Sequence, residues 1–484
     1  MSSIPSRINV YLNFLSHFKL KSINTLSYLA LKRQFSSENK HSEPHHHHHH
    51  HHHHPYSSLY VSGRYGTKMF KVFNPLYDVG YLKYLNNNRD LVRELIWKRN
   101  IRISHDFDTI FGDIEKLIDF KVKLMPLEES RNKMQKKMEI KKKKGKPIGK
   151  DENDENVFIN ELNDLKLKVN ELHEQIWDLE EIVIPFVLNL PNDLHENVKS
   201  YLNTVQSFKP VKNDGEFKQL NHNQLSYINQ CYYKSLVGPK SDYLLGEGAK
   251  LQFALVNYFS NFLSEKLNFI EISGIDFVKS AVLEACNYTD FNHLKQHSCR
   301  ITLGYDTTED NQQLHLVGNS SFESLIAVLK NSINDSELKD KNVFSVGTQF
   351  IGDFQQYQAI HGVCFTDKFQ STKLINQIFN LCFDQFKSLE IKSRLTHCNV
   401  VLMKPNEYDR YEIDIWIESK RQWINVFYIR QFNDYVSRRL GIKDLEIIDL
   451  SISCSNALIF SIIEHHQTSN GKFTMPKCLQ NFML

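Results

Sequence analysis

The chain has 484 residues, and its 59 lysines and arginines nearly balance its 56 aspartates and glutamates, leaving a formal net charge of +3. This length predicts two or three domains of about 100–200 residues each. With 41% hydrophobic and 24% charged residues, the composition excludes a largely disordered or fibrous chain. The eight cysteines form no CxxC pair, which argues against a disulfide framework or a zinc ribbon. No apolar run reaches the roughly 18 residues of a membrane-spanning helix.

Residues 1–37 form a basic segment without a single acid before Glu38. Its five cations alternate with serine and with apolar residues; they are Arg7, Lys19, Lys21, Lys32 and Arg33. This pattern is typical of a mitochondrial transit peptide, so we expect a removable leader and a location in the mitochondrial matrix. The alternative is an ordinary basic and disordered N-terminus.

Ten consecutive histidines, His45 to His54, stand between Pro44 and Pro55. A histidine-rich tract can bind metal ions, but flanking prolines and low complexity favour a linker. We therefore interpret residues 38–74 as a histidine-rich linker and predict no metal site there.

Two apolar stripes predict a pair of long helices. The second stripe is a sustained heptad pattern with steps of four and three residues: Phe158, Leu162, Leu165, Val169, Leu172, Ile176, Leu179 and Val183. An earlier stripe runs from Phe107 to Leu124 and continues weakly to Met138. Because neither stripe can stay solvated, we expect an antiparallel helical hairpin within residues 75–192. Proline should kink or interrupt the first helix at Pro126, and Ile184-Pro185 and Leu190-Pro191-Asn192 should break the second.

The tip of this hairpin concentrates positive charge. Between Arg131 and Lys150 there are ten basic residues and one acid, Glu139. Such a cluster suits contact with a phosphate backbone, although a solvated loop without a partner would have the same composition. The candidate RNA-binding residues are Lys133, Lys136, Lys137, Lys141, Lys142, Lys143, Lys144 and Lys146.

After an irregular connection at 193–240, residues 241–484 alternate helical and extended patterns. Lys250–Leu267 reads as an amphipathic helix. Five segments read as strands: Val343–Val346, Gln358–Phe365, Cys398–Met403, Tyr411–Ile417 and Gln422–Ile429. A large antiparallel sheet flanked by helices follows, so the predicted class is α+β.

Six short segments, in collinear order, resemble seryl-tRNA synthetase, a class II aminoacyl-tRNA synthetase, over about residues 75–484. They are Leu190-Pro191-Asn192, Tyr243–Leu251, Asp276–Lys279, Tyr411–Trp416, Asp434–Arg439 and Gly471–Leu479. The resemblance implies a helical arm that binds tRNA, followed by a class II synthetase-like antiparallel sheet domain flanked by helices.

The same resemblance implies departures at the positions that carry catalysis. The glutamate that holds the serine substrate corresponds to Ser321, and the arginine and glutamate of motif 2 correspond to Ser345 and Gly347. The metal-binding glutamate corresponds to Asn425 and the motif 3 arginine to Ala457. Because amino-acid activation depends on stabilising charge at the phosphate of ATP, these joint losses predict an inactive site.

Other residues in the domain are interpreted as structural. Phe427 and Tyr428 are expected to fill the space where serine would sit, and Glu464 with the Arg438-Arg439 pair is expected to have structural roles. His293, His297 and Cys299 are not taken as a metal site, nor His465-His466 as catalytic. No cofactor is predicted.

The resemblance is greatest to the catalytically degenerate seryl-tRNA synthetase-like proteins of insect mitochondria. It implies a non-catalytic partner that forms a heterodimer with the authentic mitochondrial seryl-tRNA synthetase, binds tRNA or other RNA, and supports mitochondrial translation. A self-dimer is the alternative assembly. A divergent active serine–tRNA ligase and an RNA-binding scaffold that uses only its basic arm are the alternative functions.

Overall fold

The computed structural model describes residues 57–64, 75–103, 105–143, 152–210, 219–234, 242–286, 299–301, 314–332, 335–351 and 355–483. The expected leader, the histidine tract, Lys144, Lys146, His293 and His297 lie outside these residues, and only the backbone is described for Lys141, Lys142, Lys143 and Cys299. Within the described part of the chain, no helix combines the length and apolar character needed to cross a membrane.

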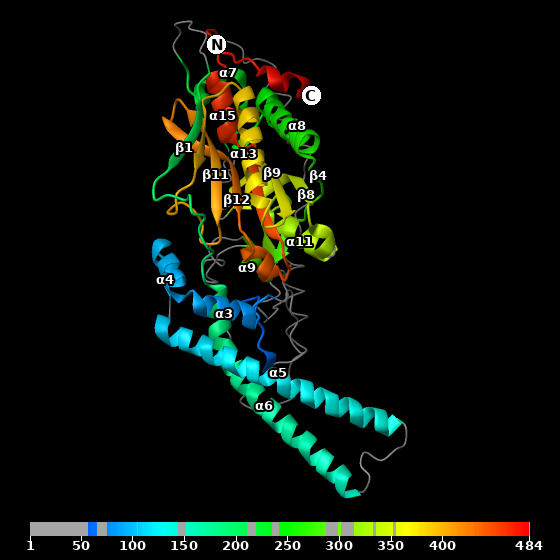
Figure 1. Ribbon diagram of the computed structural model, residues 1–484. Coiled ribbons are helices and arrows are strands. Elements are labelled where there is room, and N and C mark those ends of the chain that lie inside the picture. The colour runs from blue at the N-terminus through cyan, green and yellow to red at the C-terminus, as the bar shows by residue number, and fades with distance from the viewer. Residues whose placement is uncertain are drawn as a thin grey trace, which may run out of the picture. The chain divides into compact units, whose positions relative to one another are not determined.

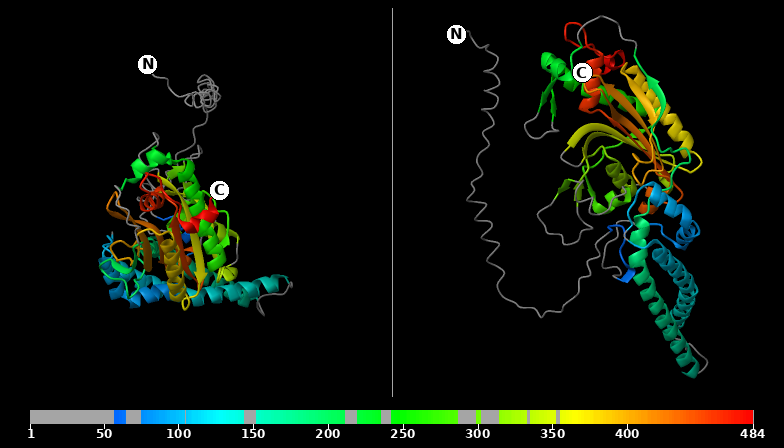
Figure 2. Two further views of the ribbon diagram at one scale, coloured as in Figure 1. Left: turned by 90° about the horizontal axis from the view of Figure 1, so that it is seen from above. Right: turned by 90° about the vertical axis from the view of Figure 1, so that its left-hand side faces the viewer.

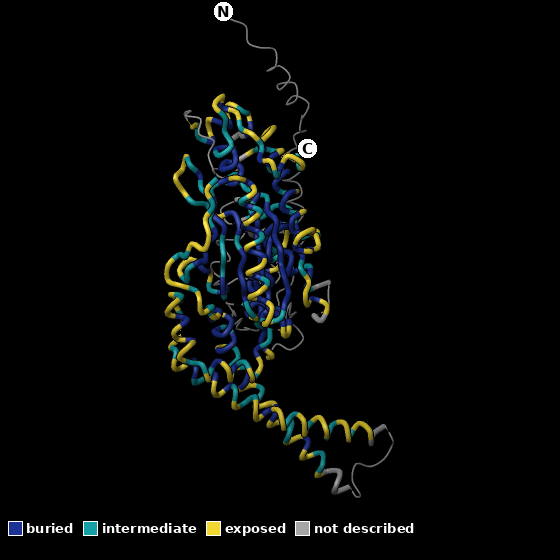
Figure 3. Tube along the Cα trace, turned by 45° about the horizontal axis from the view of Figure 1, so that its top comes forward, coloured by how far each residue is buried: buried dark blue, intermediate teal, exposed yellow. Residues whose placement is uncertain are grey.

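The predicted helical hairpin is confirmed (Figure 1). Two short helices, α3 (Val79–Asn87) and α4 (Arg89–Lys98), precede the long helices α5 (Phe107–Lys143) and α6 (Glu152–Leu188). Every second position of the predicted heptad stripe in α6 is buried, namely Leu162, Val169, Ile176 and Val183. Figure 3 shows that the rest of the hairpin surface is largely exposed.

Both prolines lie inside continuous helices, so an interruption at Pro126 and a break at Pro185 are wrong, whereas α6 does end just before Leu190-Pro191-Asn192; a kink at Pro126 stays a prediction. Pro126 is solvent-exposed within α5, and α6 continues three residues past Pro185 before it ends at Leu188. A proline in a helix interior costs about 3 kcal/mol, because it removes one hydrogen bond and its ring crowds the preceding turn. Packing along a partner helix of equal length offsets that cost here, since tertiary packing supplies most helix stability.

The C-terminal domain is built on an eight-stranded sheet in the order β1-β10-β11-β12-β13-β9-β8-β4. All its neighbouring strands are antiparallel except β4 and β8. The strands are β1 (Asn203–Phe208), β4 (Ile270–Glu271), β8 (Asn342–Ile351), β9 (Gln355–Thr366), β10 (Ser393–His397), β11 (Asp409–Ile417), β12 (Gln422–Gln431) and β13 (Glu446–Ser453). The predicted α+β class is therefore confirmed.

One predicted strand, Cys398–Met403, is wrong. This segment is a series of turns after β10, in which Val401 and Leu402 face solvent at 78% and 58% exposure while Cys398 and Met403 are buried. The Asn399 side chain accepts a hydrogen bond from the backbone N–H of Leu402 at 3.0 Å. That local bond fixes a turn, which explains why an apolar run fails to form a strand.

Helices cover the sheet on both sides. The face formed by residues such as Phe427 and Leu450 packs against α8 (Gly246–Leu267), α13 (Ser371–Ser388) and α15 (Asn456–His465). Figure 2 shows α13 lying along one side of the sheet. Further short helices and strands complete the described part of the chain. The helices are α7 (His222–Asn229), α9 (Ser280–Cys286), α11 (Phe322–Ser332), α12 (Asp335–Leu338), α14 (Tyr435–Leu440) and the 3₁₀ helix Lys477–Phe482. The strands are β2 (Tyr232–Lys234) paired with β3 (Asp242–Leu244), and β5 (Phe277–Lys279), β7 (Leu314–Leu316) and β6 (Cys299–Ile301) in a second small sheet.

A set of buried hydrogen bonds joins the end of α6 to the sheet domain. The Asn192 side-chain amide donates to the backbone oxygens of Asn406 at 2.9 Å and Phe432 at 2.8 Å. The hydroxyl of Tyr435 donates to Leu190 O at 3.2 Å, and the Arg439 guanidinium donates to Leu188 O. The Leu190-Pro191-Asn192 segment thus terminates the arm helix and fixes it to α14.

The paired arginines have structural partners on both sides of this junction. Arg439 lies over the ring of Tyr435 at 3.7 Å, and Arg438 lies over the ring of Tyr81 in α3 at 4.0 Å. Cation–π contacts of this kind add about 0.5–2 kcal/mol each, depending on burial. These contacts tie the arm to the sheet domain.

Truncating the buried stripe of the hairpin should open it locally. We expect Ile176→Ala, at a side chain only 4% exposed, to destabilise α5 and α6 by about 2–5 kcal/mol, because it leaves a cavity between them. Hydrogen exchange of the α5 and α6 amides measures this loss. Ile182→Ala is the matched control in the same helix, since that isoleucine is 43% exposed. Equal exchange in the two variants would contradict the packing described here.

Candidate functional site

The loop Gly318–Ser321 and strand β8 bring three of the predicted degenerate positions together. Ser345 in β8 donates its hydroxyl to the backbone oxygen of Asn319 at 2.9 Å. Ser321, two residues further along the loop, donates to Gly318 O at 2.8 Å. The Asn319 side-chain oxygen accepts the backbone N–H of Thr348, next to Gly347, at 3.0 Å. The loop and the strand therefore satisfy each other's polar groups.

Gly347 leaves room for Asn319. A Cβ atom at position 347 would lie 2.0 Å from the Asn319 side-chain oxygen, far inside van der Waals contact. No larger side chain fits at position 347 while Asn319 keeps this position. The neighbouring Ser320 hydroxyl donates to the backbone oxygens of Ser345 at 3.1 Å and Ala359 at 2.8 Å, and both contacts are buried.

Asn425 and Ala457 lie apart from this cluster. Asn425 is exposed on β12 and donates to the backbone oxygen of Phe427 at 2.9 Å. Ala457 lies in the first turn of α15. Among the described residues, no hydrogen bond joins Asn425 to the loop that holds Ser321.

A row of polar side chains crosses the sheet on the face away from α8 and α13. Strand register places Glu412 opposite Tyr428, Tyr428 opposite Ser451, and Ser451 opposite His361. His361 in turn lies opposite Ser345. The row thus leads from β11 to the cluster at Gly318–Ser321.

Buried charges fill the next row of this face. Arg430 pairs with Asp449 and, at 3.2 Å, with Glu407, while Asp449 also hydrogen-bonds to His361. Arg410 pairs with Glu407 at 3.3 Å and with Glu412 at 2.5 Å. Burial alone would raise the pKa of Asp449, but Arg430 and His361 beside it lower that pKa below its ordinary value.

Aromatic rings enclose the central guanidinium. The Arg430 guanidinium lies 4.8 Å from the ring centre of Tyr428, 5.3 Å from that of Phe432 and 5.8 Å from that of Phe322. Phe427 does not take part, because it points to the opposite face and packs in the core against Phe386. The expectation that Phe427 fills this side of the sheet is therefore wrong, since neighbouring strand residues alternate between faces. Of these two residues, only Tyr428 lies on the polar face with Arg430.

Sequence reasoning missed this ion cluster. The only signals are charged residues at alternate positions of β11, such as Arg410 and Glu412, one charge in β12 and two in β13. Which charge meets which depends on strand register, and one residue of slip would move each to the other face.

Glu464 links three segments of the domain. It accepts hydrogen bonds from the backbone N–H of His222 at 2.9 Å and of Ser419 at 3.0 Å, and it contacts the His222 ring at 2.7 Å. Burial opposes ionisation, yet these hydrogen bonds outweigh it and lower the pKa of Glu464 to about 2. The contacts give Glu464 a structural role. His465 and His466 likewise bond to backbone oxygens, of Ser461 and Leu389, at 2.8 Å each.

The described part of the basic arm presents its lysines to solvent. Lys133, Lys136 and Lys137 are exposed on α5, and Lys133 pairs with Glu129 at 2.5 Å. Lys141, Lys142 and Lys143 lie in the last turn of the helix. The described residues contain no group of three histidines, cysteines or acids arranged to hold a metal ion.

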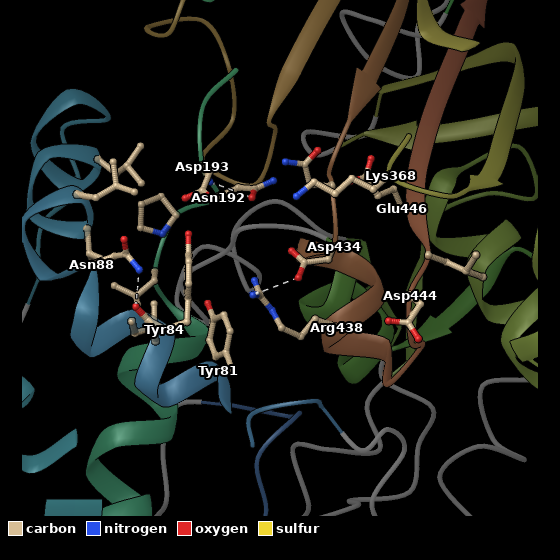
Figure 4. Close-up of a pocket in the computed structure, with 18 of the residues that line it drawn as sticks. Tyr81, Tyr84, Asn88, Asn192, Asp193, Lys368, Asp434, Arg438, Asp444 and Glu446 are labelled. Carbon is tan, nitrogen blue, oxygen red and sulfur yellow. Dashed lines mark hydrogen bonds and ion pairs between the residues drawn. The ribbon is translucent and has the colours of Figure 1, made fainter. Parts of the chain in front are cut away.

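A pocket of about 790 Å³, which sequence reasoning did not predict, lies between the short helices α3 and α4 and the sheet domain (Figure 4). Tyr81 and Tyr84 form one wall; Asp434, which caps the N-terminus of α14, and Arg438 within that helix form the other. Asp193 lies beside the arm junction at Asn192. Burial raises the pKa of Asp193 above its ordinary value.

Comparison with known proteins shows which family this chain is similar to. Residues 82–194 match the family model of the Seryl-tRNA synthetase N-terminal domain. The serine–tRNA ligase of Nitrosopumilus maritimus is 19% identical over 432 residues, which cover 83% of this chain and 98% of that protein. The serine–tRNA synthetase-like protein Slimp of Drosophila melanogaster is 22% identical over 448 residues, covering 84% of this chain and 89% of that protein.

Solved structures agree on the fold. Seryl-tRNA synthetase from Pyrococcus horikoshii, complexed with ATP, superposes with a TM-score of 0.68 at 19% identity and covers 84% of this chain and 98% of its own. The cytoplasmic serine–tRNA ligase of Naegleria fowleri, in complex with AMP, gives a TM-score of 0.64 at 14% identity, with 85% and 98% covered. The chain therefore has a segment that matches the seryl-tRNA synthetase N-terminal domain and the fold of class II seryl-tRNA synthetases, and its sequence is similar to serine–tRNA ligases and to the synthetase-like protein of the fly.

Proposed function

We propose that the protein is a non-catalytic mitochondrial paralogue of seryl-tRNA synthetase, which acts as a binding and regulatory partner of the authentic mitochondrial enzyme and of RNA. The observation that carries this proposal is the occupied face of the sheet, where Asn319 packs against Gly347 and the Arg430 cluster closes the neighbouring row. The basic leader would direct the chain to the mitochondrial matrix, where the partner would support translation.

The charge balance of the sheet face supports the loss of catalysis. Activation of an amino acid needs positive charge, from arginines or metal ions, that is free to stabilise the reacting phosphate. Here two guanidiniums, of Arg410 and Arg430, are engaged by three carboxylates, of Glu407, Glu412 and Asp449. Neither arginine retains charge to offer to ATP, and Ser345 and Gly347 supply none.

Serine activation is the direct test against the alternative, a divergent active serine–tRNA ligase. We expect no serine-dependent exchange of pyrophosphate into ATP by the purified full chain, because Arg410 and Arg430 are held by carboxylates and Ser345 and Gly347 carry no charge. A serine–tRNA ligase assayed in parallel serves as the positive control. Exchange at a rate comparable with that enzyme would establish the active-ligase alternative instead.

The arm supports a role in binding RNA, which also fits the third possibility, a scaffold that uses the arm alone. We expect the triple change Lys133→Gln, Lys136→Gln and Lys137→Gln to weaken binding of tRNA and to lower the slope of log affinity against log salt by about 2, because each phosphate contact releases roughly 0.7–0.9 of a counterion. Filter binding over a range of salt concentrations measures both quantities.

A matched variant separates the arm from general charge. Lys266, Lys420 and Lys443 are exposed lysines of the sheet domain, and their change to glutamine removes the same charge elsewhere. If both triple variants lose RNA binding equally, the arm has no special role.

Exposed apolar side chains support a partner on the segment from α8 to β5. Phe253, Ile270, Ile275 and Phe277 are each at least 44% exposed, although this segment otherwise contributes to the core. Apolar surface of this kind marks protein interfaces. Asp276–Lys279 in this segment resembles motif 1, which builds the dimer interface in class II synthetases. A heterodimer with the authentic synthetase is therefore proposed, with a self-dimer as the alternative.

Co-expression with the authentic mitochondrial synthetase tests this assembly. We expect a 1:1 complex by analytical ultracentrifugation, which Ile270→Asp should weaken at least tenfold because it buries a charge in the interface. Val401→Asp is the control, since Val401 is 78% exposed on a distant segment of the sequence. A chain that only pairs with itself, or stays monomeric, would rule out the heterodimer.

A further inference from the structure

We propose that the pocket between α3, α4 and α14 binds a basic, partly apolar segment of a partner protein. The pocket is separate from the sheet face and from the basic arm, so the proposal does not depend on the loss of ligase activity. Its volume of about 790 Å³ lies within the range of ligand pockets, which is about 300–1,000 Å³.

One side of the pocket is apolar and partly open. Leu85, Val92 and Leu95 form its buried floor. Leu91 at 42% and Phe369 at 93% exposure line its rim and have apolar surface left to cover. A segment that brings apolar side chains to this rim would bury that surface.

The other side carries more negative than positive charge. Five carboxylates and three cations line the pocket: Asp193, Asp367, Asp434, Asp444 and Glu446, against Lys339, Lys368 and Arg438. Two of the cations are already engaged. Lys339 pairs with Asp367 at 3.3 Å, and Arg438 lies between the Tyr81 ring at 4.0 Å and Asp434 at 3.6 Å. No cation in the described ranges comes within ion-pairing distance of Asp193 or Asp444.

These charges select the class of partner. The phosphates of a nucleotide or of RNA would be repelled by the surplus carboxylates, and a neutral ligand would leave Asp193 and Asp444 without an ion-pair partner. Lysine or arginine side chains of a bound segment would supply an ion-pair partner to each of these acids. They also find the ring of Tyr84, which points into the pocket (Figure 4) and is 45% exposed, as a surface for cation–π contact.

The combination of an apolar rim and an acidic wall favours a peptide over a small cation. A free cation would satisfy the carboxylates but leave Leu91 and Phe369 exposed, whereas a segment with alternating apolar and basic side chains covers both. The partner is therefore a protein chain with such a segment at its surface.

Peptide binding to the full-length chain tests the proposal. The probe is a fluorescein-labelled octapeptide of alternating leucine and arginine, and its binding is followed by fluorescence anisotropy. We expect saturable binding of this probe. A peptide with glutamate in place of arginine, and a second peptide with alanine in place of leucine, should each bind at least about tenfold more weakly. Binding should also weaken as salt rises, because the carboxylates are partly exposed to solvent.

Variants locate the site. Asp193→Asn with Asp444→Asn should weaken binding of the leucine–arginine peptide by about tenfold, because both surplus charges are removed without a change of shape. In the Leu91→Glu variant, the affinities for the leucine–arginine peptide and the peptide with alanine in place of leucine should differ less, because the apolar contact at the rim is lost. Asp164→Asn, at an exposed acid of α6, is the control and should bind like the unchanged chain.

Each other outcome would overturn the proposal. Absence of saturable binding, or binding that the double variant leaves unchanged, would remove the pocket as a peptide site. Tighter binding of a peptide of residues 1–37 than of any other probe would make this chain's own leader the occupant. Self-association that the double variant abolishes would make the occupant a second copy.

Discussion

The buried guanidinium of Arg430 is the constraint on which the C-terminal domain depends. A charge in the middle of a sheet is costly to desolvate, so it persists only with carboxylates held close and with its hydrogen bonds satisfied. Asp449 on the next strand and Glu407 on the loop before β11 meet that need, and Glu407 in turn holds Arg410. Removing one member of such a buried pair typically costs about 3–5 kcal/mol. Strand register, the loop and the polar face are thereby locked together.

The two faces of the sheet therefore differ in the side chains that they present. The apolar face belongs to the core with α8, α13 and α15. The polar face is the one on which a synthetase-type site would need free charges, but its arginines and acids are engaged with one another. Near the other end of the row, Asn319 takes the space beside Gly347. The proposed binding functions therefore use other surfaces, namely the arm, the apolar segment from α8 to β5 and the pocket at the arm junction.

Sequence reasoning reached the parts of the fold that depend on local periodicity. The heptad pattern from Phe158 to Val183 predicts both the helix and its buried side, because the apolar stripe can be identified from the sequence without knowing which helix packs against it. Cys398–Met403 was misread because the Asn399 turn competes with its apolar pattern. The Arg430 cluster was missed, and Phe427 was placed on the wrong face, because both depend on register between strands far apart in the sequence. Of the candidate site, Ser321, Ser345 and Gly347 do converge, whereas Asn425 lies apart from their loop.

The two ends of the arm differ in the sign of their charge, and this difference assigns different partners to them. The exposed lysines of α5 attract phosphate, while the surplus carboxylates beside α3 and α4 repel it and attract cations. At about 0.15 M salt, charges are screened beyond roughly 8 Å, so each end acts on its own surroundings. A nucleic acid on the arm and a basic protein segment in the pocket therefore need not compete. The net charge of +3 hides this arrangement, since it averages a basic tip with an acidic pocket.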